Sequence, residues 1–178
     1  VAELELLNTL DRFLQDDRFQ GLSDTRLAEA IEESELDPTL SGHLRTAAAR
    51  LGTRLVVRSS AVSEDGQQAS WAGQFETVVG VRPGDETERA LLKCWASAFH
   101  ARAQAYKRRV RFPDRIQMAV LIQPVVEPKC AGVMFTINPL SGSWRELTVE
   151  AAWGQAHSVV QGEVVPDYHV VRRPRRTI

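Results

Sequence analysis

The sequence predicts an α+β protein, and two patterns of apolar residues lead to this prediction. Over the first fifty residues the apolar side chains recur at the spacing of amphipathic helices, whereas after residue 115 they fall in short β-rich runs separated by turn residues. Strands do not alternate with helices as in βαβ units, so we expect a mixed, largely antiparallel sheet with packed helices. The 178 residues have room for one domain of ordinary size.

The amino-terminal part of the chain, residues 1–52, is expected to be helical. A stripe of Leu and Phe side chains predicts a helix over Glu3–Gln15. Asp24 and Pro38 are typical of the first residues of two further helices, and Gly52 is typical of a helix end.

The remainder, residues 53–178, is expected to combine strands with one long helix. The short β-rich run Leu55–Val57 leads into a polar loop that begins at Arg58, and Asp85 begins a helix that continues to Tyr106. The other predicted strands are Phe75–Val81, Ile116–Pro124, Ala131–Ile137, Glu146–Ala151, His157–Val164 and Tyr168–Arg172.

Composition excludes several classes of protein. The 22 basic and 23 acidic residues give a net charge of -1, which argues against nucleic acid as a partner, and 43% hydrophobic residues argue against disorder. The apolar runs are far shorter than the roughly 20 residues that cross a bilayer. Cys94 and Cys130 have neither disulfide nor zinc-site spacing. We therefore expect a cytoplasmic protein without a membrane or nucleic-acid partner.

Arg58 is the first candidate for chemistry. An arginine that follows a buried strand can offer its planar, charged guanidinium to phosphate oxygens, with the hydroxyl and backbone N–H of Ser59 beside it. The alternative is an ion pair of Arg58 with Glu64 or Asp65 that only holds the loop.

Two further segments could approach a ligand through their backbone. Small residues around Gly73 allow close approach, although a hairpin turn with Trp71 packed on the core explains the same residues. After a predicted strand, the carbonyl group of Gln123 and the amide of Val125 could read adenine, because Pro124 has no N–H. A strand that simply ends at a proline is the alternative.

Glu150 and Gln161 are candidate metal ligands. Each lies towards the end of a predicted strand, and a carboxylate and a carboxamide supply the hard oxygen atoms that Mg²⁺ prefers, with water and substrate phosphates in the other positions. A solvated glutamate on a hairpin explains Glu150 equally simply.

Taken in order, these segments form a set of motifs that is more specific than any one of them. The set consists of Val57-Arg58-Ser59-Ser60-Ala61, Glu64-Asp65, Ala69-Ser70-Trp71-Ala72-Gly73-Gln74-Phe75-Glu76-Thr77, Cys94-Trp95-Ala96-Ser97, Gln123-Pro124-Val125-Val126, Gly132-Val133-Met134-Phe135-Thr136, Asn138-Pro139, Glu150-Ala151-Ala152-Trp153-Gly154 and Val159-Val160-Gln161-Gly162. From about residue 38 to residue 171 the chain resembles the amino-terminal nucleotide-binding domain of phosphoenolpyruvate synthase and pyruvate phosphate dikinase. Rifampin phosphotransferases share this domain.

The resemblance implies an ATP-grasp fold, in which two α+β subdomains hold ATP and Mg²⁺ between them. It also implies that the β-phosphate of ATP passes to a histidine on a separate swivelling domain, and that a further domain binds the acceptor. A piece of such an enzyme is expected to be inactive alone. The implied site residues are Arg58 as the catalytic phosphate contact, Ser59, Gly73 and Thr77 as further ATP contacts, Gln123, Pro124 and Val125 on the adenine side, and Glu150 and Gln161 as metal ligands.

The chain also departs from the family pattern. Gly-Leu-Gly-Glu in the family stands here as Gly154-Gln155-Ala156-His157, a usual basic residue is Glu163, and no lysine takes the place of the one in the family's opening Gly-Gly-Lys segment. Loss of a glycine and of a phosphate cation would weaken triphosphate binding. The alternatives are therefore a degenerate ATP-grasp module for binding or regulation, or the ATP-binding part of a rifampin-phosphotransferase-like enzyme or an ATP-dependent ligase.

Overall fold

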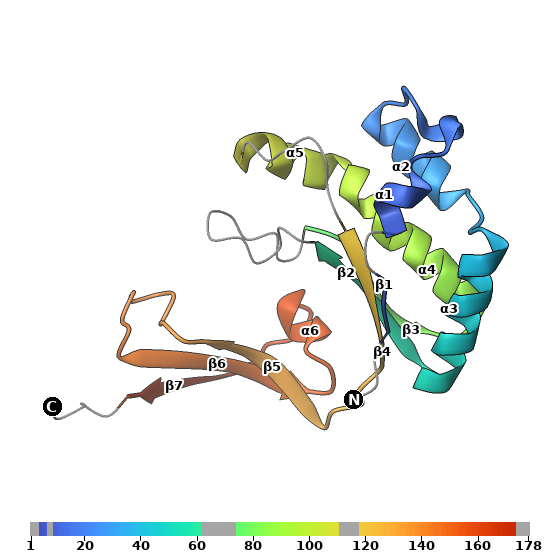
Figure 1. The fold of residues 1–178 in the computed structure, drawn as a ribbon. Helices are drawn as coiled ribbons and strands as arrows, with labels where there is room; N and C mark the ends of the chain where they lie inside the picture. Colours follow the sequence, from blue (N-terminus) through green and yellow to red (C-terminus); the bar gives the residue numbers. More distant parts are fainter. Residues whose placement is uncertain (1–3, 7–8, 62–73, 111–117, 174–178) are drawn as a thin grey trace, which may run out of the picture. The chain divides into compact units, whose positions relative to one another are not determined.

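The computed structural model of this chain describes residues 4–6, 9–61, 74–110 and 118–173 (Figure 1). Contacts divide the chain into two compact units, one up to Val125 and one from Val126 onward. Both sides of the predicted boundary at residue 52 contribute to the first unit. The division of the chain into domains at that residue stays a prediction.

The first unit is built on a four-stranded antiparallel sheet with the order β1-β4-β2-β3. These strands are β1 (Leu4–Leu6), β2 (Leu55–Ala61), β3 (Thr77–Val81) and β4 (Met118–Pro124). The register between β2 and β3 shifts after Leu55, where β3 passes from Val81 to Val79 and Gly80 adopts a φ of 83°. Glycine is favoured at such a bulge because its backbone reaches positive φ without a steric cost.

Helices cover one side of this sheet (Figure 1). They are α1 (Thr9–Phe13), α2 (Asp24–Glu32), α3 (Pro38–Leu51), α4 (Asp85–Ala96) and α5 (Ala101–Val110), with short 3₁₀ turns at Asp17–Phe19 and Ser97–Phe99. Asp37 shows why α3 begins where it does. Its carboxylate accepts hydrogen bonds of 3.0 Å from the amides of Thr39 and Leu40, and Pro38 provides a fixed φ at the first turn.

The core of this unit lies between α4 and the sheet. Leu91 and Trp95 of α4 are fully buried in one cluster with Leu55 and Val57 of β2. Burying an aliphatic side chain of this size contributes about 1.5–3 kcal/mol. The apolar stripe predicted for the long helix therefore faces the sheet, as its helical spacing requires.

Two predicted helices of the first unit differ from those observed. Residues 4–6 form β1 and not the start of a helix, because Leu4–Leu6 pair with Val120–Ile122 of β4 and tertiary pairing prevails over local propensity. The predicted long helix is interrupted at Ser97, whose hydroxyl donates to the carbonyl of Cys94 (2.7 Å) and accepts from the amide of Glu76 (3.0 Å). Such side-chain hydrogen bonds compete with the helical ladder.

The second unit is a three-stranded antiparallel sheet with the order β5-β6-β7. Its strands are β5 (Cys130–Phe135), β6 (Glu146–Trp153) and β7 (Asp167–Arg172), and α6 (His157–Val160) lies between β6 and β7 in the sequence. The predicted strand His157–Val164 is wrong. The amides of Val160 and Gln161 donate to the carbonyl groups of Ala156 and His157, both at 2.9 Å, and so form a helical turn.

The buried thiol of Cys94 generates a prediction on pH dependence. Burial, and secondly the charge of Glu76, raise the pKa of this thiol to about 12, above the ordinary value of about 8.5. The unfolded chain therefore loses this proton first, so the free energy of unfolding should fall as the pH rises from about 8.5 towards 12. Denaturant titrations at a series of pH values should show a steeper fall for the natural chain than for Cys94→Ala.

Thiol labelling provides an independent check on Cys94. In the folded chain the exposed Cys130 should react with a maleimide at neutral pH, whereas Cys94 should react only after denaturation. Rapid labelling of Cys94 under native conditions, or equal pH slopes for the two chains, would contradict the assignment.

Candidate functional site

Three of the residues predicted to bind ATP lie on one face of the first sheet. Arg58 of β2 stands opposite Thr77 of β3, and Gln123 of β4 stands opposite Val56, two residues before Arg58. Since side chains alternate along a strand, Arg58, Thr77 and Gln123 share the face that the helices leave uncovered. The side chains of Arg58 and Thr77 are exposed.

Arg58 and Ser59 lie in a strand and not in the predicted loop, because β2 continues to Ala61. Because both residues lie in a strand, their side chains point to opposite faces of the sheet. Arg58 points to solvent, and no carboxylate within the described ranges pairs with its guanidinium. Ser59 is 7% exposed and faces the helical core, so any contact that it makes on the open face must come from its backbone.

Other residues of the phosphate-side prediction fall outside the described ranges. They are Gly73, Trp71 and the two acidic residues that would compete for Arg58, namely Glu64 and Asp65. The roles assigned to them stay predictions.

The adenine-side segment offers fewer hydrogen-bonding groups than expected. The amide of Val125 donates to the carbonyl oxygen of Arg54 at 2.9 Å, so it is not available to a base. Pro124 has no amide hydrogen. The half-buried Gln123 is engaged in an interaction of its own. Adenine could therefore be read here only through carbonyl oxygens or the Gln123 carboxamide.

The second unit contains both candidate metal ligands. Glu150 is half-buried in β6, opposite Val133 of β5 and Tyr168 of β7. Gln161 ends α6, where its amide donates to the carbonyl group of His157 and its side chain is exposed.

The donor set at Glu150 consists of oxygen atoms. Thr148 precedes Glu150 by two residues and so shares its face of β6; its buried hydroxyl has no hydrogen-bond partner within the described residues. The described residues contain no cluster of three or more His, Cys, Asp or Glu side chains that could enclose a metal ion. One carboxylate beside neutral oxygens fits a Mg²⁺ ion that keeps water and nucleotide phosphates as its other ligands, but not a fully enclosed ion.

Gly132 lies against the backbone of Glu150, a close contact that we did not predict from the sequence. A β-carbon at Gly132 would lie 1.9 Å from the carbonyl oxygen of Glu150 and 2.7 Å from the α-carbon of Ala151. Only glycine allows β5 and β6 to approach this closely. The signal was present in the sequence, because an isolated glycine within a strand indicates close approach of another backbone.

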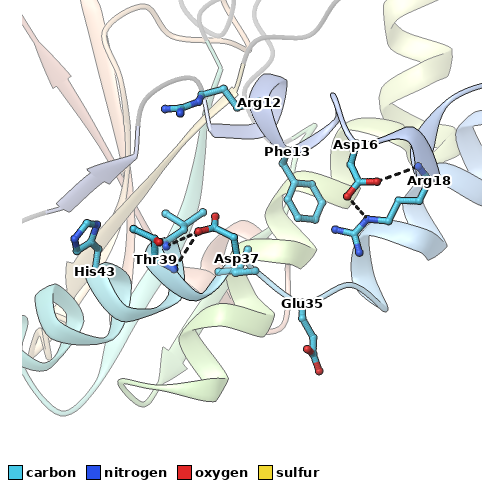
Figure 2. A pocket seen from close by; sticks show the side chains of 10 residues that line it. Arg12, Phe13, Asp16, Arg18, Glu35, Asp37, Thr39 and His43 are labelled. Atoms are coloured by element: carbon cyan, nitrogen blue, oxygen red, sulfur yellow. Dashed lines mark hydrogen bonds and ion pairs between the residues drawn. The ribbon is translucent and has the colours of Figure 1, made fainter.

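A separate hollow of about 530 Å³ opens in the first unit between α1, the 3₁₀ turn that follows it and α3 (Figure 2). Several of its charged side chains already have partners. Arg18 pairs with Asp16 at 3.2 Å, and Asp37 caps α3. The lining contains none of the residues predicted to bind ATP.

The fold and the open face around Arg58 define an α+β protein with an antiparallel sheet that presents an exposed arginine to solvent. The chain matches the family described as "Pyruvate phosphate dikinase, AMP/ATP-binding domain" over residues 5–178. It belongs to this family of nucleotide-binding domains, in agreement with the resemblance seen in the sequence.

Named relatives support the same assignment. The chain is 33% identical to a probable phosphoenolpyruvate synthase of Pyrococcus horikoshii, over 94% of this chain and 22% of the relative. It is 39% identical to a rifampicin phosphotransferase of Streptomyces sviceus, over 93% of this chain and 20% of the relative. It is also 41% identical to the prodigiosin synthesizing transferase PigC of Serratia marcescens over 67% of this chain. The chain thus spans about a fifth of the length of the first two relatives.

The described helices include none that is long and apolar enough to cross a membrane.

The close approach at Gly132 predicts a specific effect on β6. Gly132→Ala should destabilise the chain by about 1–3 kcal/mol, because the new methyl group meets the backbone of β6 and not a flexible side chain. Hydrogen exchange followed by mass spectrometry should show faster exchange in residues 146–153. As a control, Gly42→Ala in α3 adds a methyl group where no atom lies within 4 Å, and it should stabilise the helix slightly. Unchanged exchange in β6 of Gly132→Ala would contradict the prediction.

Proposed function

We propose that this chain holds Mg-ATP for phosphoryl transfer, as the nucleotide-binding part of a phosphotransferase related to phosphoenolpyruvate synthase and pyruvate phosphate dikinase. The observation that carries the proposal is the match to an AMP/ATP-binding domain over residues 5–178. The exposed Arg58 beside Thr77 and Gln123 on one open sheet face supports it. An ATP-grasp fold, a cytoplasmic location and the absence of a nucleic-acid partner are part of the same proposal.

In this function Arg58 neutralises charge on the phosphate oxygens. Its guanidinium is permanently charged and planar, so it can donate two parallel hydrogen bonds to a phosphate and orient it. Phosphoryl transfer needs little covalent help from the protein, so positioning and charge neutralisation by such residues are the main contributions. Mg²⁺, when bound, would add further charge neutralisation, and Glu150 and Gln161 are the residues that would hold it.

The receiving histidine and the acceptor site are expected on other parts of a longer protein. The two relatives of Pyrococcus horikoshii and Streptomyces sviceus are about five times as long as this chain, which is consistent with such parts. Their names include both a phosphoenolpyruvate synthase and a rifampicin phosphotransferase. The acceptor therefore stays open between pyruvate, an antibiotic and another substrate.

A degenerate module that binds or regulates is the second candidate, because Gly154-Gln155-Ala156-His157 departs from the family pattern. The backbone at this loop weakens that alternative. Gly154, which the chain retains, has a φ of 85°, whereas Ala156 has φ and ψ of −64° and −13°, values that any residue adopts. Replacing a glycine at position 156 therefore costs no backbone strain. The added negative charge of Glu163 and the replacement of the family's glutamate by His157 are departures that still favour degeneracy.

Calorimetric titration of the full-length protein with Mg-ATP tests the proposed site. The natural protein should bind, and Arg58→Ala should weaken binding about tenfold to a hundredfold, because a charged hydrogen bond contributes about 1.5–3 kcal/mol. Glu150→Ala should lower the affinity in the presence of Mg²⁺ more than in EDTA. Arg50→Ala and Glu29→Ala, at exposed positions on α3 and α2, are the matched controls.

The same titration separates the two candidate functions. Absence of binding by the natural protein would support the degenerate module and overturn the enzyme proposal. Phosphate on a histidine of this chain after incubation with ATP would overturn the assignment of the phospho-carrier to another domain.

Glu163→Lys tests how much the family departure costs. Glu163 is exposed, and its backbone amide donates to the carbonyl of Ser158 at 2.9 Å, so a change of side chain leaves this hydrogen bond in place. If residue 163 faces the phosphates, reversal of its charge should raise the affinity for Mg-ATP severalfold, and the gain should shrink at high salt. An affinity that does not change would show that position 163 is remote from the nucleotide.

A further inference from the structure

One end of the second unit carries exposed apolar side chains together with arginines. We define the hairpin patch as the set of residues at the turn between β5 and β6 and at the adjacent end of β7 (Figure 1), namely Ile137, Leu140, Trp144, Arg145, Arg172 and Arg173. The exposed fractions of the three apolar members are 54% for Ile137, 86% for Leu140 and 63% for Trp144. A Trp and a Leu this exposed on one short turn mark an interaction surface more often than an isolated apolar residue does.

Hydrogen bonds hold this turn in one conformation. Asn138 is 6% exposed, and its side-chain oxygen accepts from the amides of Leu140 (2.9 Å) and Ser141 (3.2 Å). Its side-chain nitrogen donates to the carboxylate of Glu146 at 2.9 Å, and its backbone amide donates to the carbonyl of Ser143 at 3.1 Å. The exposed side chains are thus presented by a preorganised turn, which lowers the entropy lost when a partner binds.

The three arginines lie against the same turn. The guanidinium of Arg145 stands 5.3 Å from the ring centre of Trp144. The side chain of Arg173 donates to the carbonyl group of Thr136 (2.7 Å), and its backbone amide donates to the carbonyl group of Arg145 (2.8 Å). The two contacts of Arg173 tie the end of β7 to both sides of the hairpin, and the cation of Arg145 lies over the ring of Trp144.

Within the described part of the chain, the positive charge at the patch is only partly balanced by acidic side chains. Glu146 is the carboxylate that borders the patch among the described residues; one of its oxygens lies 3.5 Å from Nε of Arg172, and the other accepts from Asn138. The Arg172 side chain is still 85% exposed. In the described ranges the guanidinium groups of the patch therefore outnumber the neighbouring carboxylates, and arginine donors remain there for an anion from outside.

From these observations we propose that the hairpin patch docks an acidic protein segment, one in which carboxylates alternate with apolar side chains. Trp and Arg are the residues most enriched where partners bind tightly, and carboxylates match the forked donors of arginine. The exposed apolar residues are mainly aliphatic, and the chain carries a net charge of -1, so single-stranded nucleic acid, which needs basic stripes and stacking rings, fits less well. This inference does not depend on nucleotide binding.

A peptide titration tests the proposal directly. The full chain, labelled with 5-fluorotryptophan, is titrated with a short synthetic peptide of alternating Glu and Leu or Phe, and each tryptophan is followed by ¹⁹F NMR. The Trp144 resonance should shift on binding, whereas that of Trp153, at the other end of β6 and 83% exposed, should not. Peptides with Lys in place of Glu, or with Ser in place of Leu and Phe, should bind at least about tenfold more weakly.

Variants and competing probes complete the experiment. Trp144→Ala should weaken peptide binding about tenfold or more, and Trp153→Ala should leave it unchanged. Both residues are exposed, so circular dichroism should show folded chains. Oligo-dT and phosphatidylserine vesicles serve as alternative anions. Failure of the acidic apolar peptide to bind, an equal shift of Trp153, or tighter binding of either alternative probe at Trp144 would overturn the proposal.

Discussion

The antiparallel pairing of β2 with β4 is the constraint on which the first unit depends. The seven-residue register from Leu55 opposite Pro124 to Ala61 opposite Met118 fixes which side chains enter the helical core and which remain on the open face. A shift by one residue would bury Arg58 and expose Ser59, because successive side chains point to opposite faces. The side chains of β2 that pack against α4 thus determine that Arg58 lies on the open face. The same register sets both the packing of the core and the chemistry of that face.

In the second unit the main constraint is a close backbone contact between β5 and β6. The absence of a β-carbon at Gly132 lets β5 lie against the carbonyl of Glu150, and β7 pairs with the other edge of β6 at Tyr168. Glu150 is therefore held on a strand that is paired on both sides, and its position depends on main-chain contacts more than on side-chain partners. Ligands carried by rigid strands are placed more reproducibly than ligands carried by loops.

Much of the architecture could be predicted from the sequence. The α+β class is confirmed, and the helix that begins at Asp85 was predicted from its apolar period, although it ends at Ala96 and not at Tyr106. The misplaced elements are those in which local propensity and tertiary context disagree. Residues 4–6 have a helical apolar pattern but pair with β4, and the β-branched residues Val159 and Val160 favour a strand although one turn of α6 buries only Val159. Periodicity cannot reveal a partner that lies more than a hundred residues away in the chain.

For the candidate site, the sequence proposes a list of residues but does not show which of their atoms are available to a ligand. The pattern Gln123-Pro124-Val125 indicates a segment that reads a base, yet the amide of Val125 is already bonded to Arg54, and no sequence rule links these two residues. The same distinction applies to the departures from the family pattern. The alanine at position 156 suggests that the conformation of the family's glycine loop is lost. Its φ and ψ are ordinary values, however, so the backbone here does not require a second glycine. Among the departures from the family pattern, the acidic side chain of Glu163 therefore calls for an experimental test more than the backbone at Ala156 does.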